Sequence, residues 1–141
     1  KCILGVYNLC IIVYVVRVNR IGDKKMKYTV YQISYTDAEI DGINSGMKSL
    51  KHEIRTGMFM DFSGNKTVGL AEKALYENLY TGVAQIEADN LNEVFQVGNI
   101  GPESQITRLA NRMASVSVGD LIEDEDGNRH VVASFGFKEV V

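Results

Sequence analysis

The most informative stretch of the sequence is residues 115–141, which read SVSVGDLIEDEDGNRHVVASFGFKEVV. Two runs rich in β-branched and aromatic residues, 115–124 and 129–141, flank a short polar segment. Such residues pack well on a pleated sheet. Within the polar segment Asp126 precedes Gly127, and an Asp-Gly pair favours a tight hairpin because glycine adopts positive φ at little cost. This stretch therefore predicts a C-terminal β-hairpin.

Two glycines within these runs, Gly119 and Gly136, indicate bends or bulges. Phe135 lies beside Gly136 in the second run, and we expect its ring to lie in the core of the hairpin. Because replacing a buried Phe by Ala costs about 3–5 kcal/mol, the stability of the Phe135→Ala variant tests this expectation.

A strand and a helix are expected near the start of the domain. Residues 27–35 alternate between two faces, which predicts a strand. Thr36 and Glu39 follow at the spacing of a capping box, in which each side chain accepts a hydrogen bond from the other residue's backbone N–H. We therefore predict a helix from Thr36 to about Gly57. An apolar stripe at helical spacing supports it and consists of Ile40, Ile43, Met47, Leu50 and Ile54.

The middle of the chain carries further helix and strand signals. Apolar spacing predicts a helix from Thr67 to about Asn78, and alternation in 80–87 predicts a strand. Asp89 can cap a short helix that ends near Gly98. The order of elements predicts an α+β fold, in which two or three helices pack on one mostly antiparallel sheet.

The composition is that of an ordinary globular domain. The chain has 141 residues, of which 45% are hydrophobic and 23% charged, with one Pro, no Trp and two Cys. These values exclude a collagen-like or disordered chain and a disulfide-rich scaffold. No Pro-rich or Ser-rich linker divides the sequence, so we predict a single domain over residues 26–141.

The first 25 residues differ from the rest. Residues 2–16 form an apolar run bordered by Lys1 and Arg17, and this run is shorter than the roughly 20 residues that a membrane-spanning helix needs. Its Val, Ile and Tyr residues favour a strand, and Met26 opens a sequence typical of a protein start. An extra strand or translated upstream sequence is therefore preferred to a membrane or signal segment.

Charge is divided unevenly along the chain. The formal net charge is −3, but residues 26–141 carry 10 basic and 17 acidic side chains. An acidic domain repels the phosphate backbone, which argues against non-specific nucleic-acid binding. We expect a cytoplasmic protein that binds neither nucleic acid nor membrane.

Four consecutive acids lie at the tip of the predicted hairpin: Glu123, Asp124, Glu125 and Asp126. Carboxylate oxygens bind hard cations such as Mg²⁺ or Ca²⁺. Consecutive strand residues point to opposite faces of a sheet, so these acids converge on one ion only if a loop brings them together. A solvated turn is the preferred interpretation, and cation binding is the alternative.

A second possible cation site follows the spacing of an EF-hand loop. Its oxygen ligands would be Asp61, Ser63, Asn65, Thr67 and Glu72. Lys66 occupies the position at which that loop needs glycine for a sharp turn. A turn between two elements is therefore the preferred interpretation. The competing hypothesis is a metal-dependent enzyme or cation-binding module that uses Asp61 or the hairpin acids.

Motifs that carry catalytic chemistry are absent from the sequence. The only histidines are His52 and His130, and neither stands in the context of a nucleophile or its base. Segments 64–67 and 98–101 lack the glycine spacing of phosphate-binding and dinucleotide-binding loops. The sequence therefore favours a protein without enzymatic activity and without a cofactor.

Five tyrosines form a candidate partner-binding surface: Tyr28, Tyr31, Tyr35, Tyr76 and Tyr80. Tyrosine is common in protein interfaces because its ring packs while its hydroxyl reaches water. The alternative is that these rings cover the edges of the sheet. The first interpretation predicts binding to a protein partner or self-association into a homo-oligomer.

Three motifs carry a resemblance to a known family: MKYTVYQI at 26–33, LNEVFQVGN at 91–99, and MASVSVGDLIE at 113–123 closing with SFGFKEV at 134–140. Together they resemble the YodL-type small domain of phage and mobile-element proteins. The family has a fuller SLSVSD pattern and a shorter middle, whereas 36–78 is extended here. The resemblance implies a phage or mobile-element accessory protein with a host or phage protein as partner, and it implies no particular chemistry.

Overall fold

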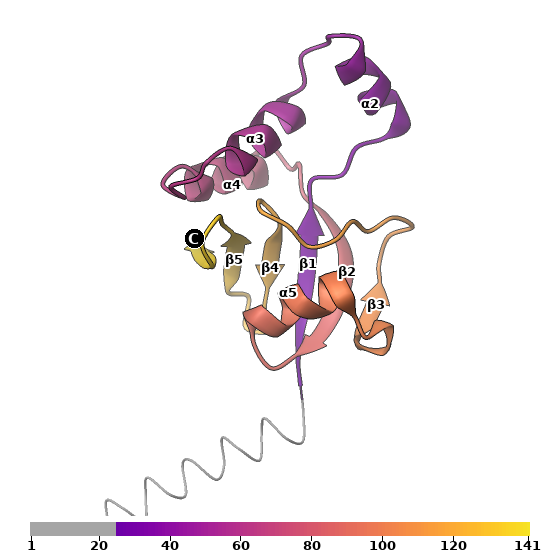
Figure 1. The fold of residues 1–141 in the computed structure, drawn as a ribbon, viewed down its shortest axis with the longest axis vertical. Helices are drawn as coiled ribbons and strands as arrows, with labels where there is room; N and C mark the ends of the chain where they lie inside the picture. Colours follow the sequence, from indigo (N-terminus) through magenta and orange to yellow (C-terminus); the bar gives the residue numbers. More distant parts are fainter. Residues whose placement is uncertain (1–24) are drawn as a thin grey trace, which may run out of the picture.

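The computed structural model describes residues 25–141, which contain one open sheet of six strands (Figure 1). The strands are β1 (Met26–Gln32), β2 (Thr81–Ala88), β3 (Ile106–Arg108), β4 (Leu121–Glu123), β5 (Arg129–Val132) and β6 (Phe137–Val140). They lie in the order β3-β2-β1-β4-β5-β6, and every neighbouring pair is antiparallel. The α+β fold with an antiparallel sheet is therefore confirmed. The strand expected within residues 2–16 lies outside the described residues.

Four α-helices, rather than two or three, accompany the sheet in residues 25–141. They are α2 (Asp37–Asn44), α3 (Leu50–Phe59), α4 (Thr67–Tyr76) and α5 (Leu91–Ile100), and a short 3₁₀ helix, η1 (Glu103–Gln105), follows α5. Within this part of the chain, no helix combines the length and the apolar character needed to cross a membrane.

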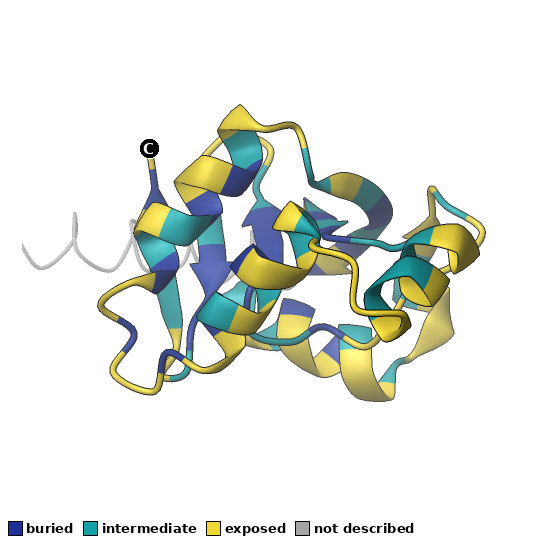
Figure 2. Ribbon diagram, turned by 90° about the horizontal axis from the view of Figure 1, so that it is seen from above, coloured by how far each residue is buried: buried dark blue, intermediate teal, exposed yellow. Residues whose placement is uncertain are grey.

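The sheet buries side chains on both of its faces. Leu121 and Ile122 are neighbours in β4, yet they belong to two different hydrophobic clusters, and the same holds for Val131 and Val132 in β5. Because successive side chains of a strand point to opposite faces, the two clusters lie on opposite sides of the sheet. Figure 2 shows the buried residues gathered in the middle of the domain.

Helix α5 covers the first face. Its Val94 and Val97 pack in one cluster with residues of β1 and β2 and with Val116, which belongs to the loop before β4. Gly98 is essential to this packing, because a Cβ atom there would lie 2.3 Å from Val116 Cγ2.

Helices α3 and α4 cover the second face. Ile54 and Met58 of α3 pack with Ala71 and Ala74 of α4 and with Leu121 of β4. All five side chains are buried. Two alanines on the inner side of α4 leave the space that the larger α3 side chains fill, which fixes α3 beside α4 above the sheet.

The predicted single helix from Thr36 to Gly57 is wrong, because the structure divides it into α2 and α3. Thr36 does form the expected capping box with Glu39. The first helix ends before Gly46, whose φ of +87° lies in the left-handed region, and Ser49 starts α3 by accepting a hydrogen bond from His52 N. The expected apolar stripe is therefore interrupted: Ile54 is buried, whereas Ile40, Met47 and Leu50 are exposed.

The C-terminal hairpin is confirmed, but the second predicted run divides into two strands. Gly136, with a φ of +68°, lies in the turn between β5 and β6, and Ala133 N donates to Gly136 O across this turn at 2.9 Å. Phe135 lies at the same turn and is 81% exposed. The expectation that its ring lies in the core is therefore wrong.

Candidate functional site

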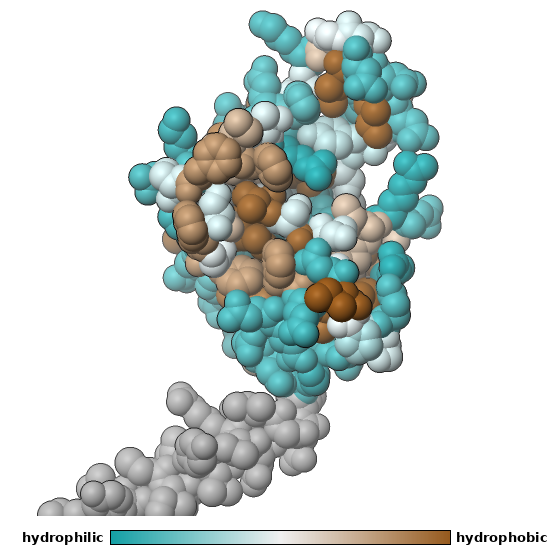
Figure 3. Space-filling model, viewed as in Figure 1, coloured by the Kyte–Doolittle hydropathy of each residue, from teal (hydrophilic) through white to brown (hydrophobic). Residues whose placement is uncertain are grey.

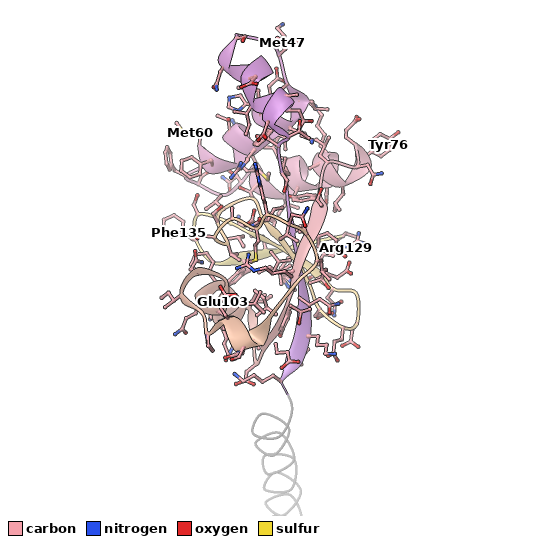
Figure 4. The ribbon with its side chains drawn as sticks, turned by 90° about the vertical axis from the view of Figure 1, so that its right-hand side faces the viewer. Met47, Met60, Tyr76, Glu103, Arg129 and Phe135 are labelled. Atoms are coloured by element: carbon pink, nitrogen blue, oxygen red, sulfur yellow. The ribbon has the colours of Figure 1, made fainter. Side chains whose placement is uncertain are left out.

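Three large apolar side chains project into solvent from one region of the domain. Met60 is 57% exposed, Phe62 is 68% exposed, and Phe135 at the β5–β6 turn is 81% exposed. We call these three residues the apolar patch. In Figure 4, Met60 and Phe135 project from the same side of the molecule, and Figure 3 shows a brown, hydrophobic area on that side, over the α3–α4 connection and the β5–β6 turn.

Direct hydrogen bonds join the two segments that carry the apolar patch. Ser134 Oγ donates to the backbone oxygen of Asp61 at 2.8 Å, and these residues immediately precede Phe135 and Phe62. Lys138 Nζ donates to the backbone oxygen of Gly64, also at 2.8 Å. Hydrogen bonds within the folded chain therefore hold the two segments that carry the patch residues together.

Asp61, a candidate metal ligand, holds the α3–α4 connection in place. One carboxylate oxygen accepts hydrogen bonds from Lys66 N, Thr67 N and Thr67 Oγ, each 2.8 Å long, and the other accepts from Ser63 Oγ at 3.0 Å. Burial alone would raise the pKa of Asp61, but these donors together outweigh it and hold the pKa at about 2, below the ordinary 3.8. The carboxylate thus caps α4. Glu72, the other candidate carboxylate ligand, is exposed on that helix.

The side chains of three of the four hairpin acids form hydrogen bonds or a salt bridge at or near the β4–β5 turn. Asp124 accepts hydrogen bonds from Asp126 N, Asn128 N and Asn128 Nδ2. Glu123 forms a salt bridge with Arg129, and Glu125 accepts from Lys27 N. Among residues 25–141, no group of three or more His, Cys, Asp or Glu side chains is placed to hold a metal ion.

The five candidate tyrosines do not gather on one exposed surface. Tyr28 is only 6% exposed, and Tyr31, Tyr35 and Tyr80 are half-buried. Tyr80 Oη donates to the backbone oxygen of Gly119 at 2.7 Å. Tyr76 is 88% exposed, but Figure 4 places it on the side of the molecule opposite Met60 and Phe135.

A buried polar network anchors the loop before β4. Gln32 Nε2 donates to Asp120 Oδ2 at 2.9 Å and to Ala114 O at 3.0 Å, and Ala114 N donates back to Gln32 Oε1 at 3.0 Å. Ser117 N also donates to Asp120 Oδ2. Burial raises the pKa of Asp120 to about 6, and the donors from Ser117 and Gln32 and the charge of Arg55 reduce this rise.

Arg55 of α3 stacks over the ring of Tyr35, with its guanidinium carbon 5.5 Å from the ring centre. Such a cation–π contact fixes the position of a guanidinium without using its hydrogen-bond donors. Arg55 forms no salt bridge within the described part of the chain. Its donors are therefore available to a bound group.

Sequence reasoning missed the apolar patch and the roles of Arg55 and Asp120. The available signal for the patch was the run MFMDF at 58–62 directly before a turn, because a turn cannot bury every apolar residue beside it. No local pattern marks Arg55 or Asp120, since each depends on residues distant in sequence.

No known protein family, no curated protein and no solved structure matches this chain.

Proposed function

We propose that this domain is a phage or mobile-element accessory module that binds a host or phage protein in the cytoplasm through the apolar patch of Met60, Phe62 and Phe135. The observation that carries the proposal is the exposure of three large apolar side chains from two segments that hydrogen bonds tie together. Clustered apolar exposure of this kind marks interaction surfaces. The resemblance of residues 26–140 to a phage and mobile-element domain supports the proposed origin.

The charges beside the patch favour a partner with an acidic rim. Lys66 lies in the connection that carries Phe62, and Lys138 donates to Gly64 in the same connection. A symmetric contact between two copies of this chain would bring these cations toward one another, and like charges at an interface disfavour association. An apolar surface bordered by carboxylates avoids this repulsion, so the proposed partner is a different protein.

Site-specific photocrosslinking tests this function. p-Benzoylphenylalanine placed at position 62 or 135 of the full chain, in the cells that express it, should give an adduct of one defined mass that mass spectrometry assigns to a different polypeptide. The matched control carries the same probe at position 76, where Tyr76 is more exposed than Phe62 or Phe135 but lies on the opposite side.

The pattern of adducts decides the outcome. Adducts at positions 62 and 135 but not 76 support the patch as the docking surface. An adduct with the mass of two copies of this chain would overturn the heterologous partner in favour of self-association. Equal labelling at all three positions, or no adduct at any, would contradict a specific interface at the patch.

A further inference from the structure

A pocket of about 390 Å³ lies between α2, α3 and the segment that follows β1. Its lining residues are Tyr35, Ile40, Ile43, Asn44, His52, Arg55, Thr56 and Phe59. Small-molecule sites in proteins have volumes of roughly 300–1,000 Å³. None of the apolar patch residues lines this pocket, so it is a separate site.

The pocket carries a positive charge although the domain is acidic. Residues 26–141 contain 17 acidic side chains, yet none is among the eight that line the pocket. Two acids of α2 are paired, Glu39 with Lys51 and Asp37 with Arg112, and the third, Asp41, is exposed and does not line the pocket. Asp120 is buried and accepts hydrogen bonds from Gln32 and Ser117. Arg55 is therefore the dominant charge in the lining.

Arg55 is positioned to receive an anion. Its stacking on Tyr35 holds the guanidinium at the wall of the pocket, and no described residue forms a salt bridge with it. A guanidinium presents its N–H donors in a planar fork that matches the two oxygens of a carboxylate. The anion that best fits this geometry is therefore a carboxylate.

The rest of the lining suits an apolar body attached to that carboxylate. Ile40 and Ile43 contribute from α2, and Phe59 contributes from the end of α3. Ile40 and Phe59 are exposed, and a ligand that covers them would remove apolar surface from water. No side chain of α2 is buried, so the side of α2 that lines the pocket is still accessible to a ligand.

One further atom beside the pocket lacks a partner. Tyr35 Oη is buried and makes no hydrogen bond, alone in this respect among the described side chains. Buried polar groups are almost always paired, and each exception calls for an explanation, such as a bound water or ion. The unpaired hydroxyl belongs to Tyr35, the lining residue on which the Arg55 guanidinium stacks.

We propose that the pocket between α2 and α3 binds a small organic carboxylate that carries an aromatic or branched apolar group. The carboxylate pairs with Arg55, and the apolar group packs against Ile40, Ile43 and Phe59. Asn44, His52 and Thr56 border the site and offer further polar contacts. This ligand differs from the protein partner proposed for the apolar patch, and its binding does not depend on that partner.

A titration of the full chain with 2-naphthoate, followed by ¹⁵N-resolved NMR, tests this inference. We expect saturable shifts of backbone signals from residues 40–44 and 52–59. The matched neutral probe is 2-naphthamide, which keeps the ring but not the charge. We expect Arg55→Gln to weaken naphthoate binding about tenfold or more, because a charge-assisted bidentate pair is lost. Lys73→Gln removes an exposed cation outside the pocket and should leave binding unchanged.

Equal binding of naphthoate and naphthamide, or no saturable shift at millimolar concentration, would overturn the proposal, as would unaltered binding by a folded Arg55→Gln variant. If Arg55→Gln does not fold, the comparison of the two probes on the unchanged chain decides. Phe62→Ser provides a further check: it should abolish crosslinking by the probe at position 135 but leave naphthoate binding intact. The two proposals can therefore fail separately.

Discussion

One carboxylate oxygen of Asp61 accepts two hydrogen bonds from Thr67, from its backbone N–H and from its hydroxyl, each 2.8 Å long. Thr67 is the first residue of α4, and the N-cap residue Lys66 contributes no side-chain cap. Asp61 therefore caps α4 from outside the helix and places a negative charge at its positive end. A residue that resembled a metal ligand in the sequence has a structural role in the fold.

Asp61→Asn should destabilise the domain at neutral pH and have little effect in strong acid. Because the folded chain lowers the pKa of Asp61 from 3.8 to about 2, the ionised carboxylate stabilises the fold above about pH 4, and this contribution is lost as the pH falls toward about 2. Thermal unfolding followed by circular dichroism should show a lower Tm for the variant at pH 7. The difference should shrink as the pH falls. Equal Tm values at pH 7 would contradict the capping role.

Asp120 should produce the opposite pH dependence. Burial raises its pKa from 3.8 to about 6 in the folded chain, so the folded state binds more protons than the unfolded state between about pH 4 and 6, and stability falls as the pH rises through that range. Asp120→Asn removes this titration. Relative to the unchanged chain, its free energy of unfolding should rise by up to about 3 kcal/mol between pH 4 and 7.

Urea denaturation of both proteins at several pH values measures this difference. The asparagine can still accept from Gln32 Nε2 and Ser117 N through its amide oxygen, which makes it a conservative comparison. A difference that stays constant from pH 4 to 7 would show that Asp120 titrates alike in the folded and unfolded chains.

The two helical glycines Gly98 and Gly69 should respond oppositely to substitution by alanine. A Cβ atom on Gly98 would lie 2.3 Å from Cγ2 of the buried Val116, so Gly98→Ala should cost about 1–3 kcal/mol through overpacking. Apart from the adjacent backbone of its own helix, no atom lies within 4 Å of the Cβ position on Gly69, and alanine there should stabilise α4 by about 0.5–1 kcal/mol. Urea midpoints at one pH compare the two variants. An unchanged urea midpoint for Gly98→Ala would show that the loop around Val116 can move to make room for the added methyl group.

Features set by neighbouring residues could be predicted from the sequence, because the atoms that decide them lie within a few positions. The capping box is such a feature: Glu39 N donates to Thr36 Oγ1, and Thr36 N donates to the Glu39 carboxylate. The alternation in β1 is another, since Tyr28, Val30 and Gln32 are the buried residues that the pattern places on one face.

The end of α2 could not be predicted in the same way. A glycine inside a helix costs only about 1 kcal/mol, so spacing alone does not show whether Gly46 continues or ends it. The ending depends on Gly46 adopting positive φ while Ser49 caps the next helix. These conformations are stable only because α3 then packs Ile54 and Met58 on the sheet. The pocket between α2 and α3 exists because of this break and was therefore invisible in the sequence.

Replacing Phe135 should leave the stability of the domain nearly unchanged. Its ring is largely exposed at the β5–β6 turn, so Phe135→Ala should change the free energy of unfolding by less than about 0.5 kcal/mol, as is usual for surface positions. The matched core variant is Met58→Ala, because Met58 is fully buried on the second face of the sheet and its truncation should cost about 2–5 kcal/mol. Urea denaturation at one pH, with the slopes compared to confirm the same two-state unfolding, measures both. A loss above about 2 kcal/mol in Phe135→Ala would mean that the ring packs against the domain as a buried side chain does, and it would remove Phe135 from the apolar patch.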